Sequence, residues 1–356
     1  MKKTVLLLFG GKSPEHEISI KTAYNVVNAL DKDLFNYILV GISRTGTFYC
    51  ITIDQIEAIA NVHGAILDNQ NYPQACFLQT QQKIYLNDTE IDVVFPLLHG
   101  GSGEDGAPQG FFNMLNLPFV GNDIKSSAIC MDKDFTKKLL QTEGIPVVNW
   151  ISIREGEAFN HEDIIKKFGF PLFVKAAEQG SSVGTYKVKK GEDLTAVIEK
   201  TFKYGKKVII EPCVAVREIE VAVLGNADNI KVSTLGEIIV SKNHEFYSYA
   251  SKYVDPHGAI VDMNPSIKPE IAEKIKDYAR KAFKILECTG LARIDFFLTH
   301  DDVIYLNEIN TMPGFTNISM YPKLWMTQEI SYKDLITTLL NLAFEHFNKK
   351  QSYLLV

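Results

Sequence analysis

The sequence of 356 residues contains no long hydrophobic run. Its apolar start, Thr4 to Phe9, follows two lysines as in a signal peptide, but it stops at Gly10-Gly11 and no small-residue cleavage pattern follows. Spanning a bilayer takes roughly 20 apolar residues in succession. We therefore expect Thr4 to Phe9 to form a buried strand, and we expect no membrane partner.

Closely spaced cysteines are also missing, because the five cysteines are scattered at Cys50, Cys76, Cys130, Cys213 and Cys288. Zinc and redox sites use close pairs of cysteines. The pattern indicates free thiols in a reducing cytoplasm. Basic residues are not in excess either. The net charge of -6 argues against nucleic acid or an anionic membrane surface as the main partner.

Two common nucleotide-binding motifs are absent. No GxxxxGK[ST] occurs, so the chain has no P-loop. No GxGxxG follows a predicted strand, which counts against a nicotinamide-dependent oxidoreductase. Any phosphate group must therefore be bound by a different architecture.

What is present is the composition of a globular enzyme, with 46% hydrophobic and 22% charged residues. Thr4 to Phe9, the amphipathic stretch Ile18 to Leu30, and Tyr37 to Ile42 have the spacing of a βαβ unit. Ile91 to Leu98 predicts another buried strand, followed by the glycine-rich loop His99 to Gly106. Ligands of such sheets bind at the carboxyl ends of the strands, where this loop should lie.

The pattern of elements changes near residue 126 and again after Pro212. We expect mixed α/β and α+β architecture in three domains: a Rossmann-like parallel-sheet domain (1–125), a small central α+β domain (126–213) and a carboxyl-terminal α+β domain (214–356). In the third domain Pro269 begins a strongly amphipathic helix. An aromatic-rich loop at 242–256 contains too many large side chains for a passive connection.

A predicted hairpin contains the sharpest group of polar residues. Two strand-like runs flank a polar turn at Asp301-Asp302. Pairing across that turn places Asp295 opposite Glu308 and, two residues on, Arg293 opposite Asn310. Because side chains alternate between the two faces of a strand, all four should lie on one face.

The chemistry of this group leaves two interpretations. Carboxylates about 5 Å apart repel each other, so a positive charge has to lie near Asp295 and Glu308. Arg293 could supply that charge in an ion-pair cluster without function. The neutral oxygen of Asn310 favours a Mg²⁺ (or Mn²⁺) site completed by nucleotide phosphates, because hard cations prefer oxygen donors.

A second candidate is the strand end at Lys175 and the loop Gln179 to Gly184 that follows it. Its backbone amides and the hydroxyls of Ser181 and Ser182 could cover phosphates. Such loops are usually only turns, and a neighbouring lysine is usually solvated. The functional interpretation therefore depends on the other motifs.

Taken in order along the chain, these motifs resemble the ATP-grasp fold and, within it, the D-alanine:D-alanine ligase family. The resemblance covers nearly the whole chain and rests on Gly10 to Glu17, His99 to Gly106, Lys133, Lys175, Gln179 to Gly184, Glu211 to Val214, Glu218, Gly290 to Asp295 and Asn307 to Thr316. One departure is Ala176, where the family commonly has proline. It removes no functional group.

The family implies ATP and two Mg²⁺ or Mn²⁺ ions as cofactors. It also implies a D-alanyl phosphate intermediate that a second D-alanine attacks. It also implies roles for residues of this sequence. For ATP these are Lys133, Lys175, Ser181, Ser182, Glu211, Pro212, Cys213, Val214 and Glu218; for metal, Asp295, Glu308 and Asn310; for catalysis, Glu15, Ser181, Tyr253, Arg293 and Gly314; for substrate, His99, Lys252, Ser319 and Met320.

Among these, Glu15 would pair with the ammonium group of the first D-alanine. Arg293 and the backbone amide of Gly314 would stabilise the tetrahedral oxyanion. The aromatic loop would act as a lid, with Tyr253 bonded to Ser181 so that water is excluded from the acyl phosphate.

Relatives that make D-alanyl-D-lactate lack a Lys-Tyr pair in the lid, so Lys252-Tyr253 favours a dipeptide product for peptidoglycan synthesis. A ligase that joins D-alanine to D-serine or D-lactate stays open as an alternative, which the pocket around Ser319 would decide. A nucleotide-binding regulator without catalysis would be expected to have lost groups such as Arg293. The family also implies a homodimer.

Overall fold

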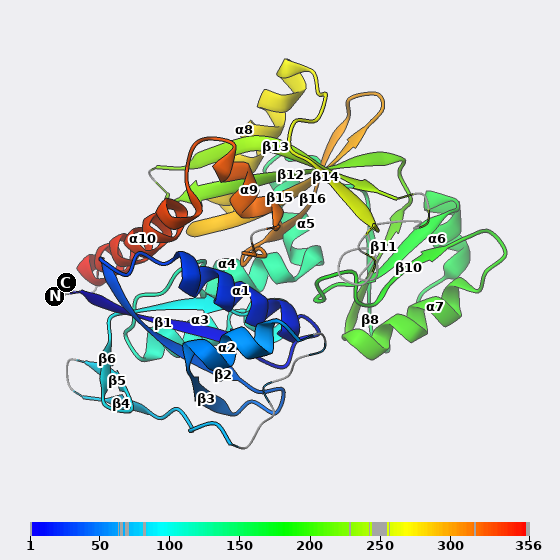
Figure 1. Ribbon diagram of the computed structural model, residues 1–356. Helices are drawn as coiled ribbons and strands as arrows, with labels where there is room; N and C mark the ends of the chain where they lie inside the picture. Colours follow the sequence, from blue (N-terminus) through cyan, green and yellow to red (C-terminus); the bar gives the residue numbers. More distant parts are fainter. Residues whose placement is uncertain are drawn as a thin grey trace.

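The computed structural model describes residues 2–353 except 63, 65–66, 68–70, 81–82, 228, 242, 244–254, 256 and 317. Figure 1 shows three regions that meet near the centre of the molecule: a blue and cyan region, a green region, and a region coloured from yellow-green to red. The five cysteines are free thiols. Among the described helices, none has the length and apolar character that crossing a membrane requires.

The amino-terminal region is built on a sheet with strand order β3-β2-β1-β7. Strands β1 (Lys3–Gly10), β2 (Phe35–Ile42) and β7 (Val93–Leu97) are parallel, and β3 (Phe48–Ile51) is antiparallel. Nearly all of β1 is buried, as expected for a parallel strand covered on both faces. The predicted first strand is confirmed.

Helices and a small second sheet complete this region. The helices are α1 (His16–Ala29), α2 (Ile53–Ala60), α3 (Ala107–Met114) and α4 (Ile124–Met131), with a short 3-10 turn at Gly101–Gly103. The small antiparallel sheet consists of β4 (Phe77–Gln79), β5 (Ile84–Leu86) and β6 (Thr89–Ile91). The predicted buried strand from Ile91 to Leu98 is confirmed over Val93–Leu97, whereas Ile91 ends β6, because Asp92 separates the two strands and its side chain accepts from the amide of Thr4 at 2.8 Å.

The central region, green in Figure 1, has a sheet of order β10-β9-β11-β8. Its elements are α5 (Lys133–Thr142), β8 (Ile151–Arg154), α6 (His161–Phe168), β9 (Leu172–Ala176), β10 (Thr185–Val188), α7 (Leu194–Thr201), a 3-10 turn at Phe202–Tyr204, and β11 (Lys207–Pro212). Apolar side chains of α6 and α7 pack on this sheet in one core. Asp132 caps α5, since its side chain accepts from the amides of Asp134 and Phe135.

The carboxyl-terminal region contains the largest sheet, of order β14-β13-β12-β15-β16. Its strands are β12 (Val216–Gly225), β13 (Lys231–Val240), β14 (Ala259–Asp262), β15 (Gly290–Thr299) and β16 (Ile304–Asn310). Helix α8 (Pro269–Ile285) begins at the predicted proline and buries Ile275, Ala279, Ala282 and Phe283. Leu140 of α5 belongs to the same core as α8 and β15.

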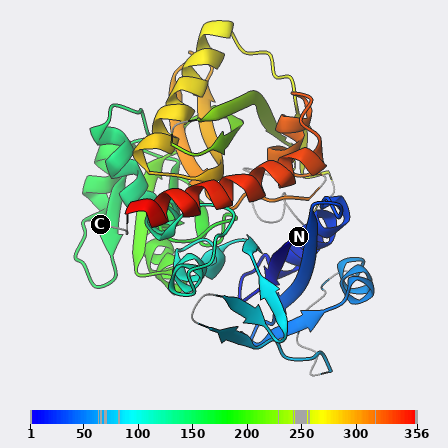
Figure 2. The ribbon, with the colours of Figure 1, turned by 90° about the vertical axis from the view of Figure 1, so that its left-hand side faces the viewer.

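Two further helices, α9 (Met320–Met326) and α10 (Tyr332–Tyr353), connect the terminal regions. Figure 2 shows α10, in red, running between the yellow and orange elements and the blue and cyan ones. Val5 and Phe95 of the first sheet share one buried cluster with Trp325 of α9 and Leu339 of α10. This continuous core fixes the two terminal regions against each other and therefore the walls of the site between them.

Candidate active site

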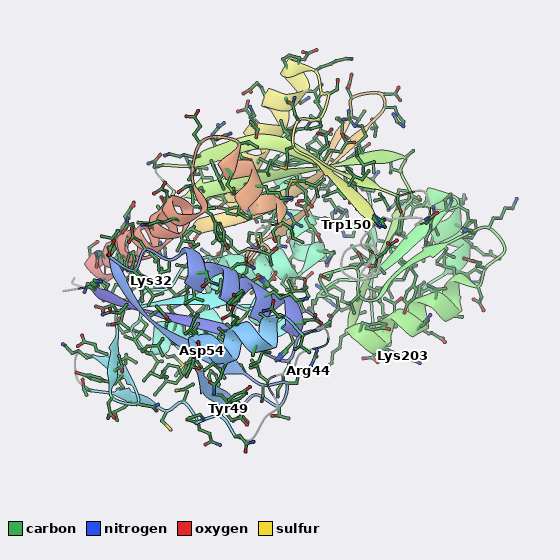
Figure 3. The ribbon with its side chains drawn as sticks, viewed as in Figure 1. Lys32, Arg44, Tyr49, Asp54, Trp150 and Lys203 are labelled. Atoms are coloured by element: carbon green, nitrogen blue, oxygen red, sulfur yellow. The ribbon has the colours of Figure 1, made fainter. Side chains whose placement is uncertain are left out.

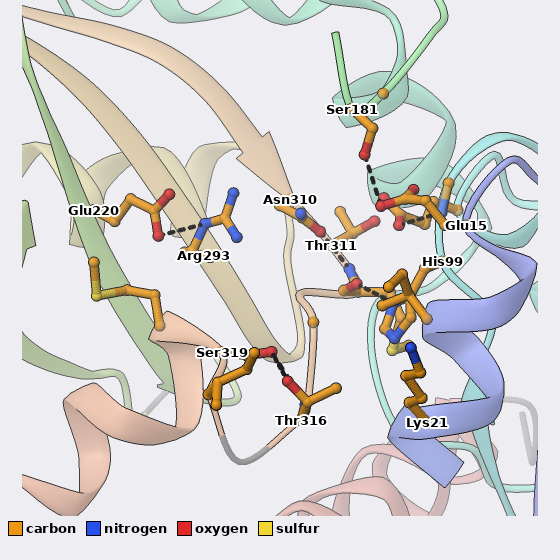
Figure 4. Close-up of a pocket in the computed structure, with 18 of the residues that line it drawn as sticks. Glu15, Lys21, His99, Ser181, Glu220, Arg293, Asn310, Thr311, Thr316 and Ser319 are labelled. Carbon is orange, nitrogen blue, oxygen red and sulfur yellow. Dashed lines mark hydrogen bonds and ion pairs between the residues drawn. The ribbon is translucent and has the colours of Figure 1, made fainter. Parts of the chain in front are cut away.

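A cavity of about 770 Å³ lies where the three regions meet. Figure 4 shows part of its lining, with Glu15 and His99 on one side and Glu220 and Arg293 on the other. Predicted site residues in its lining are Glu15, His99, Lys133, Ser181, Arg293, Glu308, Asn310, Gly314, Ser319 and Met320. Residues from all three regions thus face one space.

Glu15 lies on the amino-terminal wall of the cavity. It immediately precedes α1, and its backbone amide donates to Ser13 Oγ at 3.0 Å. Ser181 Oγ, from the glycine loop of the central region, donates to Glu15 Oε1 at 2.6 Å (Figure 4). Ser181 has a φ of 50° and Ser182 a φ of 59°, a left-handed backbone that side chains adopt at some cost and that is frequent at functional sites. The backbone of this loop thus brings the Ser181 hydroxyl to Glu15.

His99 lies beside Glu15 and is buried. Its Nδ1 is 3.0 Å from the carbonyl oxygen of Met312, and its Nε2 is 3.0 Å from Thr22 Oγ1. A carbonyl can only accept, so Nδ1 carries the proton and Nε2 accepts from the hydroxyl. Burial lowers the pKa of His99, which keeps the ring neutral. His99 thereby ties the loop after β7 to the loop after β16.

Glu104 was not singled out from the sequence, although it lies in the predicted loop. It lines the cavity, and its Oε1 accepts from the amide of Gly100 at 2.7 Å. Burial and the neighbouring charge of Glu15 raise the pKa of Glu104 to about 8. Two carboxyl groups thus share this wall, and Glu104 holds its proton at neutral pH.

The hairpin of β15 and β16 has the predicted register at the site. Asp295 pairs with Glu308 and Arg293 with Asn310. The predicted two-residue turn was wrong, because β15 ends at Thr299 and β16 begins at Ile304, with Thr299 bonded to Val303 across a longer loop.

A bulge in β16 compensates for the longer turn of this hairpin. Beyond Asp295 the pairing moves by one residue, so that Phe296 faces Leu306 and Asn307 is left out of the ladder. The extra residue restores the predicted alignment at Glu308.

A third carboxylate continues this row on the neighbouring strand. Glu220 of β12 pairs with Asp295 of β15, so Glu220, Asp295 and Glu308 follow one another across three strands. Arg293 Nε donates to Asp295 Oδ1 at 2.8 Å and Nη2 donates to Oδ2 at 2.7 Å. Arg293 Nε also lies 3.1 Å from Glu220 Oε2.

Burial alone would lower the pKa of Arg293. Asp295 and Glu220 overcome that effect and raise its pKa well above the ordinary value. The guanidinium is therefore a fixed positive charge among the carboxylates.

The lysines predicted for ATP lie next to this row. Lys133 Nζ donates to the carbonyl oxygen of Gln179 at 2.6 Å and is 3.8 Å from Glu308 Oε2. Lys175 Nζ donates to Glu211 Oε2 at 2.6 Å. Burial would lower the pKa of Lys175, but Glu211 raises it, with contributions from Glu308 and Glu218. These residues therefore form one charged network between the central and carboxyl-terminal sheets.

Lys137 adds a second positive charge beside Glu211 in this network. Its side chain is only 2% exposed, and its Nζ bonds to Glu211 Oε1 and, at 2.9 Å, to the carbonyl oxygen of Val148. It also lies 5.4 Å from the ring of Trp150, labelled in Figure 3. Burial would raise the pKa of Glu211, but Lys175 and Lys137 lower it to about 2.

The turn after β16 forms the remaining wall. Ser319 Oγ accepts from the amide of Thr316 at 3.1 Å and lies 2.7 Å from Thr316 Oγ1 (Figure 4). An added Cβ on Gly314 would come within 3.0 Å of Ser319 Oγ, so glycine allows this close approach. Met320, at the start of α9, is buried.

Several predicted residues do not line this cavity in the part of the chain that the structure describes. These are Lys175, Ser182, Glu211, Pro212, Cys213, Val214, Glu218 and Asp295. Lys252, Tyr253 and most of the predicted lid lie outside the described residues, although Asp255 near its end lines the cavity.

Comparison with known proteins decides which family these features belong to. The model of the D-ala D-ala ligase N-terminus matches residues 4–122, and that of the D-ala D-ala ligase C-terminus matches residues 139–341. The chain belongs to the D-alanine–D-alanine ligase family. The resemblance inferred from the sequence motifs is thereby confirmed.

Relatives and solved structures agree with this assignment to the D-alanine–D-alanine ligase family. A D-alanine–D-alanine ligase of Shouchella clausii is 44% identical over 360 residues, which cover 98% of this chain and 97% of the relative. The structure of the D-alanine-D-alanine ligase from Coxiella burnetii matches with a TM-score of 0.85 and 36% identity, covering 99% of this chain and 97% of that one. The expected ATP-grasp fold is confirmed.

A third match bears on substrate choice within the D-alanine–D-alanine ligase family. The VanG D-Ala:D-Ser ligase from Enterococcus faecalis has a TM-score of 0.82 and 32% identity, covering 96% of this chain and 100% of that one. A ligase with a different second substrate thus has nearly the same backbone. This similarity of fold therefore does not by itself decide the second substrate.

The sequence contained signals for three residues that were missed. Lys137 follows Lys133 by four positions, which places both on one side of α5. Glu220 follows Glu218 by two positions in β12 and therefore shares its face of the strand. For Glu104 the signal was its place in the glycine-rich loop.

Proposed function

We propose that this chain uses ATP to join two molecules of D-alanine, by way of a D-alanyl phosphate, with release of ADP and phosphate. The observation that carries the proposal is the cavity with Glu15 on one wall and Arg293, Glu308 and Asn310 on the other. The carboxylate of Glu15 suits an ammonium group. The opposite wall suits phosphates and the substrate carboxylate that is to be phosphorylated. The Shouchella clausii relative, matched over nearly the full length, supports the same reaction.

The reaction needs activation because an amine cannot displace an oxygen from a free carboxylate in neutral water. Transfer of the terminal phosphoryl group of ATP to one carboxylate oxygen of the first D-alanine releases ADP and creates a leaving group. The amine of the second D-alanine then attacks the acyl carbon, loses a proton, and the bond between that carbon and the phosphate oxygen breaks. Each cycle yields one dipeptide, one ADP and one phosphate.

Glu15 is proposed to bind the ammonium group of the first D-alanine. The Ser13 hydroxyl accepts from its amide and the Ser181 hydroxyl donates to its carboxylate, so the side chain is oriented before substrate arrives. His99, neutral and bonded through both ring nitrogens, would shape the carboxylate side of the pocket.

Arg293 and the backbone amide of Gly314 are proposed to stabilise the oxyanion that forms when the amine attacks. Both lie in the lining of the cavity, near the turn that carries Ser319. A guanidinium that is buried and permanently charged needs little reorganisation when negative charge develops beside it.

The nucleotide is proposed to lie between the central and carboxyl-terminal sheets. Lys133 and Lys175 would neutralise its phosphates under the cover of Ser181 and Ser182, and Glu218 would accept from the ribose. Glu211, Pro212, Cys213 and Val214 would line the adenine pocket. The network of Lys175 with Glu211 supports this site, because a ligand phosphate could exchange for Glu211 on the ammonium group.

Asp295, Glu308 and Asn310 are proposed to hold Mg²⁺ or Mn²⁺, as two ions. The residues fit such a site, since they offer only oxygen donors from one face of a hairpin, and Glu308 and Asn310 face the cavity. Such an ion would offset charge on the phosphates and on the phosphoryl group in transfer. Among the described residues no three His, Cys, Asp or Glu side chains form a metal-binding group by themselves. Phosphate oxygens would therefore complete the coordination.

D-alanine is the proposed second substrate, bound by Ser319 and Met320 together with Lys252, and enclosed by Tyr253 on the lid. The D-Ala:D-Ser ligase match makes D-serine the alternative to test.

The dipeptide would serve peptidoglycan synthesis in the cytoplasm. We further propose a homodimer, with neither nucleic acid nor a membrane as a partner. Domain boundaries at 125/126 and 213/214 also stay a proposal.

The test is release of ADP and phosphate by the purified protein with ATP and Mg²⁺, with D-alanine, L-alanine, D-serine or D-lactate added singly and in pairs. Products are identified by mass. Turnover with D-alanine alone and formation of D-alanyl-D-alanine is the expected result. Turnover that requires D-serine or D-lactate would show that this compound, and not D-alanine, is the second substrate. No turnover with any acceptor would overturn the proposal.

A further inference from the structure

Glu220 is the one member of the carboxylate row that no predicted role explains. It is 4% exposed, it lines the cavity, and its Oε2 lies 3.1 Å from Arg293 Nε. A buried carboxylate is costly unless it is paired, so its retention beside Arg293 calls for a reason.

The contacts of Arg293 supply that reason. In the structure its guanidinium forms a two-point contact with Asp295, at 2.8 and 2.7 Å, and the shared Nε also faces Glu220. Both oxygens of Asp295 are therefore engaged by Arg293. The same oxygens are needed if Asp295 is to bind a divalent cation, and a cation and a guanidinium repel each other at that distance.

Arg293 consequently has to give up part of its contact with Asp295 when the cation site is filled. Without a second partner it would be free to turn away from the reacting centre. Glu220 lies on the opposite side of Asp295 from Glu308 along the row, so it can keep the Nε end of the guanidinium in place.

We propose that Glu220 is a positioning residue that holds Arg293 at the reacting centre when Asp295 engages the divalent cation. The inference rests on the proposed ligase reaction for its kinetic consequences. Glu220 itself touches no reacting atom. It acts through Arg293, and it lowers the competition between Arg293 and the cation for Asp295.

The test compares Glu220→Gln with Glu237→Gln. Glu237 is a matched control, since it is also buried, lies on the neighbouring strand of the same sheet, and pairs with an arginine through Arg217 Nε at 2.9 Å and Nη2 at 2.6 Å. It is not part of the cavity lining. Both changes keep the side-chain volume and remove one charge.

In Glu220→Gln we expect kcat for dipeptide formation to fall about 10- to 100-fold, with the KM values for ATP and D-alanine changed less than about threefold. Glu237→Gln should keep kcat within about twofold. A kcat for Glu220→Gln that equals that of Glu237→Gln would overturn the inference. If Glu220→Gln does not fold, Glu220→Asp takes its place, and wild-type kcat in that shortened variant would overturn it equally.

A second readout needs no turnover. Mn²⁺ binding in the presence of ADP, followed by electron paramagnetic resonance, should weaken about 3- to 10-fold in Glu220→Gln. In an Arg293→Met background the same change should have no effect, because the competitor for Asp295 is gone. Equal weakening in both backgrounds would reduce Glu220 to a general electrostatic influence and overturn the inference. Absence of dipeptide synthesis by the wild type would overturn the ligase proposal. The Mn²⁺ affinities in the two backgrounds would then decide by themselves whether Glu220 positions Arg293.

Discussion

Ser181 Oγ donates a hydrogen bond of 2.6 Å to Glu15 Oε1, joining two residues that are 166 positions apart in the sequence. Ser181 belongs to the glycine loop of the central region, and Glu15 precedes the first helix. The bond therefore links the proposed phosphate-covering loop to the proposed ammonium-binding carboxylate. In the proposed reaction, covering the phosphates and orienting the first substrate would therefore be coupled.

Removing either partner should impair the same step. Ser181→Ala and Glu15→Gln should each lower kcat/KM for D-alanine about 10-fold or more, because a hydrogen bond to a charged group contributes roughly 1.5–3 kcal/mol. The double variant should lose less than the product of the two single effects. Steady-state kinetics of the wild type, the two single variants and the double variant measures this coupling. Glu17→Gln is the control, because Glu17 lies nearby on α1 but pairs with Lys21. Fully multiplicative losses would mean that the bond does not link the two groups.

Gly100 and Gly101 offer a second matched comparison. Both have positive φ, 70° and 47°, so alanine is strained at either position by about 1 kcal/mol. An added Cβ on Gly100 would also clash with Glu15 Oε2 and come within 2.8 Å of Ser13 Oγ, whereas at Gly101 it meets nothing within 4 Å. Gly100→Ala should therefore raise KM for D-alanine strongly.

Gly101→Ala should lower only the melting temperature. Kinetics and thermal melting of both variants distinguish the two effects. Equal KM values would show that Glu15 can move aside without loss of substrate binding.

Lys137 should matter for stability in acid. Glu211 has a pKa of about 2 in the folded state against an ordinary value of 4.5 for a glutamate, so the unfolded chain binds more protons between these values. The stabilisation is complete above about pH 4.5 and is lost as the pH falls through about 2. Lys137→Met removes one of the two cations responsible and should raise the pKa of Glu211, which moves acid unfolding to higher pH.

At neutral pH the same change should cost about 3 kcal/mol, because it leaves a buried carboxylate with one partner fewer. Lys138→Met is the control. Lys138 is half-exposed and pairs with Asp134 at 2.8 Å, so its loss should cost about 0.5 kcal/mol. Urea unfolding at pH 7 and pH 4 measures both quantities. An unchanged acid transition in Lys137→Met would mean that Lys175 alone holds Glu211 ionised.

Local patterns in the sequence predicted much of this site. Alternation in β15 and β16 was enough to place Asp295 opposite Glu308, because strand geometry converts spacing directly into position. The prediction succeeded although the turn was wrong, since the bulge at Asn307 offset the longer loop. That compensation depends on backbone conformations that no periodicity reveals.

What the sequence could not reveal were contacts across strands and between regions. The pairing of β12 with β15, which adds Glu220 to the row, requires knowledge of the strand order. The same is true of α10, whose packing between the terminal regions depends on a core assembled from both ends of the chain. Lys175 was expected to face phosphates, and its bond to Glu211 depends on the neighbouring strand β11.

Glu104 gives a prediction with the opposite sign from Glu211. Its pKa is about 8 in the folded state against an ordinary value of 4.5 for a glutamate, so between these values the folded chain binds more protons than the unfolded one. Stability should therefore fall as the pH rises from about 4.5 and should level off above about 8. Glu104→Gln keeps an acceptor for the Gly100 amide and removes this titration.

The melting temperature of Glu104→Gln should match that of the wild type near pH 4 and exceed it increasingly up to about pH 8. Asp105→Asn is the control, because it makes the same acid-to-amide change at an exposed neighbour whose side chain accepts from the amide of Ala107 at 2.9 Å. Its difference from the wild type should not grow over the same range. A constant offset for Glu104→Gln would show that Glu104 ionises freely beside Glu15. The ammonium group of the first substrate would then meet a charged Glu104 on this wall of the cavity.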